Sequence, residues 1–291
     1  MTLSKTVQNF AKNNHCTIGI CDAFPLDPAY LQKSAFVPFV RQDIKKRTDP
    51  DTILPGVQSI IVVGVGATAP VQNQIKSAAD TAQLSSIGTN YDYHPRVKFV
   101  LDQLVSDLLQ HTSFNHKILV DSPTLDERAL AQKAGIGFLG RSGLIISPQF
   151  GTRFNIGLLL IDIPLKSTAV SQGKCPTACR LCINACPNGA LQPERPLDAA
   201  RCISYLTQKK EWTGEEKTML HDQLFGCDIC QDACPFNATP HPKTYVNPQQ
   251  WLDMEDAELA EKYAHTAMLW QGTEILRRNA QAAIRLVSRR R

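Results

Sequence analysis

The sequence lacks an apolar run long enough to span a bilayer. Its longest runs, SIIVVGVGA at 59–67 and IGLLLIDIPL at 156–165, fall well short of the roughly 20 residues that a transmembrane helix needs. They predict buried strands instead. The first 15 residues also lack the apolar segment and the cleavage site of a signal peptide, so we expect a cytoplasmic protein with no membrane partner.

A strong charge of one sign is absent as well. The formal net charge of the 291 residues is +4, which is too small by itself to predict a polyanionic partner. One local exception is residues 275–291, which contain six arginines and no acidic residue. Such a run is often only a solvated helix face.

Cysteine is abundant: the chain has ten. Because a reducing cytoplasm disfavours structural disulfides, the cysteines favour metal ligation. Eight of them lie between residues 175 and 234. The other two, Cys16 and Cys21, occur in CTIGIC at the start of an expected strand, where we predict small buried apolar side chains.

Apolar periodicity predicts helices at 4–14, 95–110 and 125–134, and strands at 17–21, 59–66, 117–121, 143–147 and 156–162. This alternation indicates a fold of the α/β (α+β) class. A polar linker begins near residue 165 and precedes the cysteines. We therefore expect an α/β domain at 1–165, a cysteine-rich module at 166–245 and a C-terminal helical segment at 246–291, in which two helices at 255–290 are separated near residues 271–272.

The two dense cysteine motifs, CRLCINACP and CDICQDACP, each end in cysteine, three residues, cysteine and proline. That pattern is typical of bacterial ferredoxins, in which the cysteine before proline ligates the other cluster of the pair. Counted this way, one [4Fe-4S] cluster takes its ligands from Cys175, Cys179, Cys182 and Cys234. The second takes its ligands from Cys186, Cys202, Cys227 and Cys230.

Structural zinc is the competing hypothesis, because four thiolates in pairs also hold Zn²⁺. It does not explain the repeated Cys-Pro ending. One departure from the ferredoxin pattern is that three residues, rather than two, separate Cys175 from Cys179. About 165 residues of α/β structure precede the motifs, which predicts a reductase whose clusters feed a second redox centre.

Several further segments carry a family resemblance. They are RTDP at 47–50, DYH at 92–94, VDS at 120–122, ERALAQKAGIGFLGRSGLIISPQFG from 127, RCISYLTQKK at 201–210, FGCDICQDACPFN and WQGTEILRRNA at 270–280. In this order, and around eight cysteines, the sequence resembles the epoxyqueuosine reductases, cobalamin-dependent enzymes with two [4Fe-4S] clusters that complete queuosine synthesis in the tRNA wobble position. The resemblance implies that the α/β domain binds cobalamin and that the cysteine-rich module is ferredoxin-like.

The resemblance also implies site residues. Asp121 is the expected proton donor to the epoxide oxygen, and burial beside the corrin is expected to raise its pKa. From position alone, Asp121 could equally be a turn former or a helix N-cap. Cobalamin contacts are expected at Arg47, His94, Asp121, Gly140, Arg141 and Ser142. The family more often has lysine and asparagine where Arg141 and Ser142 stand.

The implied partners are a tRNA carrying epoxyqueuosine and an external electron donor, and the protein is expected to be a monomer. Phosphate contacts are expected from Lys209, Lys210, Arg277 and Arg278. This chain ends soon after RRNAQAAI, whereas longer family members continue into helical repeats. Two alternatives remain: a cobalamin and iron–sulfur reductase of another substrate, such as an organohalide, and a ferredoxin-type electron carrier without catalysis of its own.

Overall fold

The computed structural model describes residues 3–28, 43–68, 78, 80–193, 197–237 and 242–288. Its largest sheet has the strand order β1-β2-β7-β4, and every neighbouring pair in it is antiparallel. The strands are β1 (Cys16–Asp22), β2 (Ser59–Gly66), β4 (His116–Val120) and β7 (Phe154–Ile161). The prediction of an α/β (α+β) fold is confirmed, in its antiparallel α+β form.

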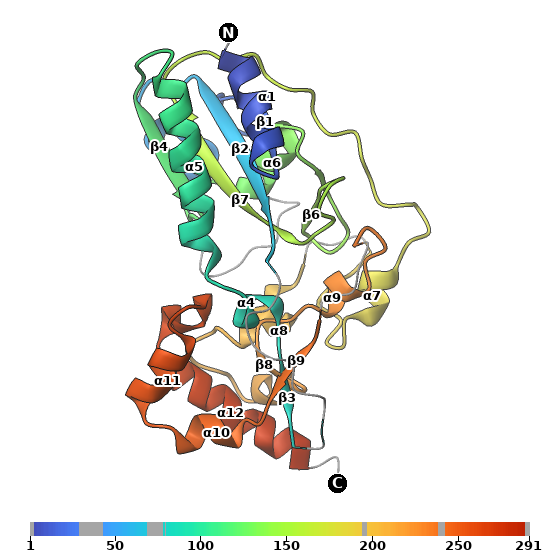
Figure 1. Cartoon of the computed structure of the whole chain (residues 1–291). Helices are drawn as coiled ribbons and strands as arrows, with labels where there is room; N and C mark the ends of the chain where they lie inside the picture. The colour runs from blue at the N-terminus through green and yellow to red at the C-terminus, as the bar shows by residue number, and fades with distance from the viewer. Residues whose placement is uncertain are drawn as a thin grey trace.

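Helices cover both faces of this sheet (Figure 1). Successive residues of β2 point to opposite faces, so Ile61 and Val63 pack under α1 (Leu3–Asn13) and α5 (Tyr93–Leu109). Ile60 and Val62 pack under α6 (Glu127–Lys133) on the other face. The two apolar faces explain why β2 is apolar along nearly its whole length. Cys16 and Cys21 of β1 are buried, at 3% and 1% exposure, as predicted.

A second, smaller sheet has the order β8-β3-β9 and joins distant parts of the chain. Its strands are β3 (Ala82–Leu84), β8 (Gln223–Phe225) and β9 (Thr244–Val246). Strand β3 belongs to the first predicted domain, yet it pairs with strands of the cysteine-rich segment. Residues of the first and second predicted segments therefore share one sheet.

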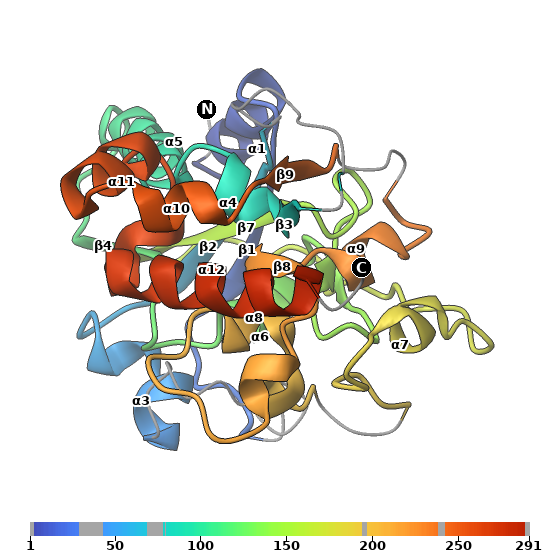
Figure 2. The same ribbon diagram turned by 90° about the horizontal axis from the view of Figure 1, so that it is seen from below.

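The C-terminal helices lie against this small sheet (Figures 1 and 2). They are α10 (Gln249–Asp253), α11 (Asp256–Tyr263) and α12 (Thr273–Ser288), with a 3-10 turn at Ala267–Gln271 before α12. Trp251 and Tyr263 fill the core between them, and the indole nitrogen of Trp251 donates a 2.8 Å hydrogen bond to the Tyr263 hydroxyl. The predicted separation of two helices near residues 271–272 corresponds to the start of α12.

The remaining elements are short, and some of them carry the cysteines. Others connect two bodies: the large sheet with its helices, called the α/β body, and the small sheet with the C-terminal helices. The short elements are α3 (Ile44–Thr48), α4 (Ser86–Thr89), β5 (Phe138–Leu139), β6 (Ile145–Ile146), α7 (Leu181–Ala185), α8 (Ile203–Leu206) and α9 (Ile229–Asp232), with 3-10 turns at Pro50–Thr52, Ala199–Arg201 and Glu216–Thr218. Helices α7 and α9, one from each cysteine motif, lie side by side. An extended segment from 162 to 180 runs along the outside of the α/β body to reach α7. No helix in the described ranges is both long enough and apolar enough to cross a membrane.

Candidate functional site

Asp121 immediately follows β4, and its backbone has a φ of +48°, in the left-handed region that few residues other than glycine, asparagine and aspartate adopt. Its side chain is 65% exposed. Oδ2 accepts a 2.6 Å hydrogen bond from the Tyr93 hydroxyl, at the start of α5. A strand end and a helix start thus bring the two side chains together. Asp121 is not a helix N-cap, because Asp126 caps α6.

His94 lies between two carboxylates. Its Nδ1 is 2.7 Å from Oδ1 of Asp92, and its Nε2 is 3.7 Å from Oδ2 of Asp121. The His94 ring also stacks on the Tyr93 ring, with centroids 4.2 Å apart. Asp92 caps α5 by accepting from the His94 backbone N–H, so the capping residue also orients the imidazole.

These neighbours determine where the proton resides. The carboxylates of Asp121 and Asp92 raise the pKa of His94 to about 9, against the opposing effect of burial. His94 and Tyr93 in turn lower the pKa of Asp121 below its ordinary value. In this structure His94 and the Tyr93 hydroxyl outweigh desolvation, whereas the raised pKa of Asp121 was expected for a carboxyl beside a corrin and stays a prediction. At neutral pH the carboxyl is ionised and His94 is protonated.

The loop after Asp121 is held at both ends. The Ser122 backbone N–H donates a 3.0 Å hydrogen bond to Oε1 of Glu127, whose pKa burial raises to about 8. At the other end, Asp126 pairs with the buried Arg47 guanidinium at 3.2 Å. Arg47 was expected to contact cobalamin; here its ion pair fixes the beginning of α6.

The first predicted set of thiols forms one group. Cys175, Cys234 and Cys179 all raise the pKa of Cys182 electrostatically, after burial itself. The four cysteines line a single small cavity, together with Arg141, Ser142, Ile146, Pro235 and Phe236. The structure thus brings Cys175 to the other three despite the longer spacing before Cys179.

The second predicted set forms a group beside the first. Burial raises the pKa of Cys227 to about 12, and the thiols of Cys202 and Cys186 contribute to the rise. Cys230 interacts with Cys227 and Cys202, and also with Cys182 of the first group. The two groups therefore adjoin. Across the described residues, no three His, Cys, Asp or Glu side chains surround a point suited to a single metal ion.

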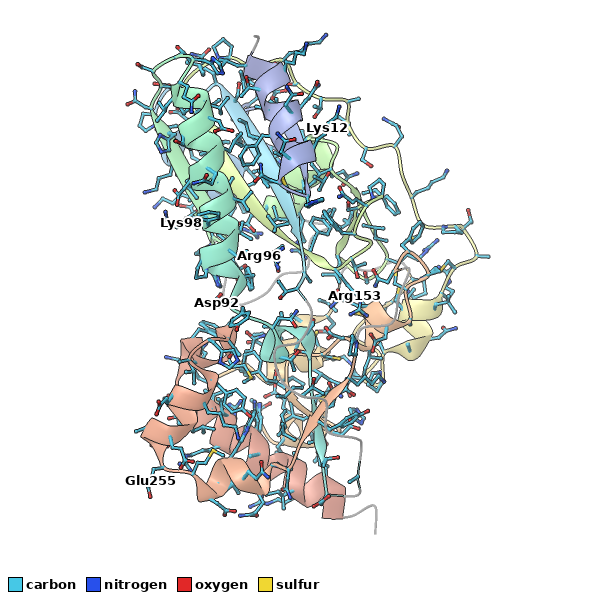
Figure 3. All side chains as sticks on the ribbon, in the orientation of Figure 1. Lys12, Asp92, Arg96, Lys98, Arg153 and Glu255 are labelled. Atoms are coloured by element: carbon cyan, nitrogen blue, oxygen red, sulfur yellow. The ribbon has the colours of Figure 1, made fainter. Side chains whose placement is uncertain are left out.

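The two bodies of the molecule meet close to these groups. Ser86 of α4 donates its backbone N–H to Asp228 at 2.6 Å, and Arg153 pairs with Asp232 at 2.6 Å. Figure 3 shows Arg153, Asp92 and Arg96 on the side of the α/β body that faces this junction. Some buried polar atoms near it have no hydrogen-bond partner among the described residues: Ser85 Oγ, Arg153 Nε and Nη1, and His265 Nε2.

The basic residues expected to contact phosphate are mostly engaged inside the protein. Arg277 pairs with Asp256 at 2.6 Å and donates to two backbone carbonyls. The Arg278 guanidinium lies 3.8 Å from the centre of the Trp212 ring and donates to the carbonyls of Lys209 and Lys210. Lys209 is paired with Glu216 at 2.8 Å. Lys209, Arg277 and Arg278 thus have partners within the protein and are half-buried, whereas Lys210 is exposed.

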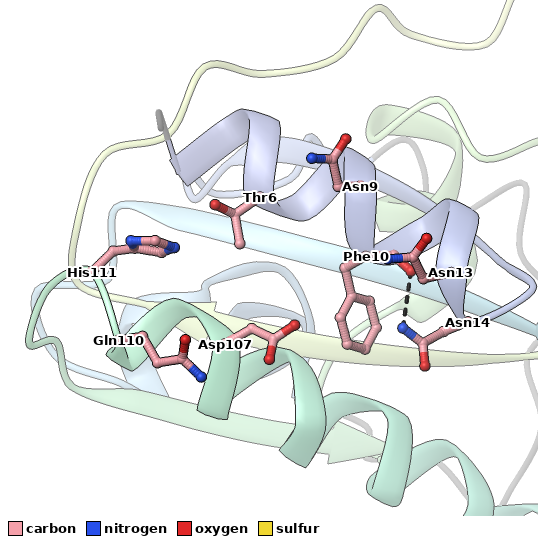
Figure 4. Close-up of a pocket in the computed structure, with 8 residues that line it drawn as sticks. All are labelled: Thr6, Asn9, Phe10, Asn13, Asn14, Asp107, Gln110 and His111. Atoms are coloured by element: carbon pink, nitrogen blue, oxygen red, sulfur yellow. Dashed lines mark hydrogen bonds between the residues drawn. The ribbon is translucent and has the colours of Figure 1, made fainter.

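Sequence reasoning did not single out Tyr93, Asp92, Glu127 or Arg153. Tyr93 and Asp92 could have been found, since both belong to the DYH motif that identified His94. A separate hollow between α1 and α5 is lined by residues such as Asn9, Asn13 and His111 (Figure 4). It contains no residue of the Asp121 group and none of the eight cysteines, so it is not part of this site.

Two family models match the chain. The model described as epoxyqueuosine reductase QueG, DUF1730, covers residues 47–122. The model described as a 4Fe-4S double cluster binding domain covers residues 174–237. The first match includes Arg47, Tyr93, His94 and Asp121, and the second includes all eight clustered cysteines.

Curated relatives and solved structures agree with these matches. The chain is 31% identical to epoxyqueuosine reductases of Bacillus subtilis and Staphylococcus aureus; the alignments cover 84% and 92% of this chain, and 67% and 76% of theirs. A crystal structure of an epoxyqueuosine reductase with an epoxyqueuosine-modified tRNA-Tyr stem loop matches with a TM-score of 0.88 at 28% identity, over 98% of this chain and 81% of that one. The Bacillus subtilis enzyme with its catalytic aspartate loop swung out of the active site matches with a TM-score of 0.85 at 25% identity, over 98% and 82% of the two chains. By sequence, cysteine pattern and fold, the chain belongs to the epoxyqueuosine reductase family.

Proposed function

We propose that this protein reduces epoxyqueuosine to queuosine in the wobble position of tRNA. The reaction removes the epoxide oxygen as water and consumes two electrons and two protons. Family membership supports the substrate. The observation that carries the chemistry is the Asp121 carboxyl, held by the Tyr93 hydroxyl at 2.6 Å beside a protonated His94 and within a molecule that also groups eight thiols.

The electrons need carriers, and the two thiol groups fit two [4Fe-4S] clusters. In the proposed ligand sets, Cys234 completes the group formed by the first three cysteines of the first motif. Cys186 and Cys202 complete the other group, with Cys227 and Cys230. The electrostatic neighbours of Cys182 and Cys227 support this division. Cys182 contributes electrostatically to the raised pKa of Cys230, which supports two neighbouring clusters between which an electron could pass.

Cobalamin is the proposed second redox centre. The unpartnered polar atoms of Ser85, Arg153 and His265 near the junction fit a ligand rich in amide groups. When bound, cobalamin would supply a low-valent cobalt able to open the epoxide. Of the expected contacts, we retain His94 and Asp121. Arg47 is paired with Asp126, and Arg141 and Ser142 line the thiol cavity.

Residues of this chain supply the proton that the departing epoxide oxygen needs. Since Asp121 is ionised at neutral pH, it must first receive the proton that it delivers to the departing oxygen. One proton source is at hand: the His94 imidazolium, whose Nε2 is 3.7 Å from Oδ2, while the Tyr93 hydroxyl keeps its proton and orients this oxygen by its hydrogen bond. We propose that Asp121 acts as the terminal proton donor of this group and that His94 holds the proton in reserve.

The tRNA would bind with its modified base splayed out of the anticodon loop. Lys210 is the candidate phosphate contact that remains of the four expected from the sequence. A tRNA substrate supports a cytoplasmic location. An external electron donor and a monomeric state complete the proposal.

The test is a single turnover by the anaerobically reconstituted protein. Protein loaded with iron, sulfide and cobalamin, reduced chemically, would be mixed with a tRNA-Tyr stem loop bearing epoxyqueuosine, and the nucleosides would then be separated. Formation of queuosine is the expected result. A protein that contains iron and cobalamin but leaves epoxyqueuosine intact would contradict the proposed substrate, whereas a protein that binds iron without cobalamin would favour an electron carrier.

A further inference from the structure

A tight turn at residues 140–144 carries Arg141 to the first thiol group. The Gly140 N–H donates to the Leu144 carbonyl at 2.8 Å, and Gly143 adopts a φ of +76°, which suits glycine. The Arg128 guanidinium, on α6, donates to the Gly143 carbonyl at 3.1 Å. The turn is therefore stabilised by a side chain of α6, the helix that follows the Asp121 loop.

Arg141 contacts the loop in which the cysteine spacing is longer than usual. Its Nη2 donates a 3.0 Å hydrogen bond to the carbonyl of Thr177. Thr177 is the middle residue of the three between Cys175 and Cys179. This hydrogen bond connects the longer loop to the α/β body, and it uses one of the N–H donors of the guanidinium.

A second donor of Arg141 points into buried space. Its Nε–H is shielded from solvent and has no hydrogen-bond partner in the part of the chain that the structure describes. Arg141 lines the same cavity as Cys175, Cys179, Cys182 and Cys234. A buried donor on a cation without an acceptor is costly, so an acceptor in this cavity is expected. The sulfur atoms of an iron–sulfur cluster, which carries net negative charge with four thiolates, meet that need.

We propose that Arg141 donates its Nε–H to the sulfur atoms of the cluster held by Cys175, Cys179, Cys182 and Cys234, and so raises the reduction potential of that cluster above that of the second. Hydrogen bonds to cluster sulfur and nearby positive charge both favour the reduced form, which is the more negative one. The electron would then reside preferentially on the first cluster. This inference rests on the proposed ligand sets.

The test is an EPR-monitored redox titration of reconstituted protein without cobalamin or tRNA. Arg141→Met removes both the charge and the Nε–H donor, whereas Arg141→Lys keeps the charge without the Nε–H. Lys174→Gln is the matched control, because Lys174 precedes Cys175 but is exposed, where solvent screens its charge. Cys202→Ala removes a ligand of the second set and thereby identifies which signal belongs to the first cluster.

We expect Arg141→Met to shift the first cluster alone to a more negative potential. At the wild-type midpoint its ratio of reduced to oxidised form should fall by about tenfold. Arg141→Lys should give a smaller shift in the same direction, and Lys174→Gln almost none. Unchanged potentials in iron-complete Arg141→Met would overturn the proposal, as would equal shifts of both clusters. If Arg141→Met loses iron, an iron-complete Arg141→Lys at the wild-type potential would overturn it. Wild-type protein that fails to form two clusters would contradict the ligand sets instead.

Discussion

The Tyr93 hydroxyl lies 2.6 Å from Oδ2 of Asp121, and this hydrogen bond joins the first turn of α5 to the end of β4. It holds the carboxyl at a backbone position with a φ of +48° and helps to lower its pKa. Burial and the Asp121 charge raise the pKa of Tyr93, so the phenol keeps its proton at any physiological pH. Tyr93 therefore acts as a permanent donor to Asp121.

Removing that donor should slow the reaction. We expect Tyr93→Phe to lower the single-turnover rate constant about 10- to 100-fold, the loss typical of one hydrogen bond to a charged group. Tyr91→Phe is the matched control, because Tyr91 is 58% exposed and only its ring edge contacts His265. Equal rates for the two variants would contradict a role of Tyr93 in orienting Asp121.

His94 should impose an alkaline limit on turnover. A pKa raised to about 9 means that the imidazolium is present at neutral pH and is lost as pH rises through about 9. The single-turnover rate constant should be nearly flat between pH 7 and 8, and should then fall by up to about tenfold per pH unit above 9. In His94→Gln the rate constant should be low and should no longer fall as the pH rises above 9. An unchanged fall at alkaline pH in the variant would assign the titration to another group.

Cys202 tests the division of the thiols, since it lies outside both dense motifs. Wild-type protein should bind about eight irons per chain and Cys202→Ala about four, with the first cluster retained. Cys21→Ala is the control, because Cys21 is a buried thiol of β1 outside both sets, and it should keep all eight irons. Metal analysis and EPR spectra measure both outcomes. Zinc in place of iron, or equal loss of both clusters, would contradict the assignment.

Arg278 should matter for stability rather than for tRNA binding. Its guanidinium stacks on Trp212 and donates hydrogen bonds to the carbonyls at the end of the segment 201–210. Arg278→Ala should therefore lower the free energy of unfolding by about 1–3 kcal/mol and the Tm by several degrees. Lys210→Ala should leave the Tm within experimental error and weaken stem-loop binding at low salt. If Arg278→Ala instead left the Tm unchanged and weakened stem-loop binding, Arg278 would again be a candidate phosphate contact.

The sequence predicted the main elements well where apolar periodicity was strong. Strand β2 was expected at 59–66 and occurs there, because both of its faces are buried and the run is apolar throughout. The proposed ligand sets come from the ferredoxin pattern, in which the cysteine before proline ligates the other cluster. The pairing of β3 with β8 and β9 was not predictable: β3 has only three residues, and its partners follow about 140 and 160 residues later.

Charged side chains were the least predictable part of the site. Arg47, Arg277 and Arg278 looked like ligand contacts from sequence, yet each is engaged by an acidic side chain or backbone carbonyls of the fold. A sequence gives the number of cations but not the groups that neutralise them. For the same reason the lowered pKa of Asp121 in this structure was not foreseen, since it depends on His94 and Tyr93, which only the fold brings within reach.

The central claim is that Asp121 delivers the proton to the departing epoxide oxygen, and Asp121→Asn tests it most directly. Asparagine tolerates the left-handed backbone of this position and can still accept a hydrogen bond from Tyr93, so the fold, both clusters and cobalamin binding should persist. The single-turnover rate constant for queuosine formation, measured with chemically reduced protein and the epoxyqueuosine stem loop, should fall by roughly 10²- to 10⁴-fold. A variant that retains cobalamin and turns over at close to the wild-type rate would contradict the account.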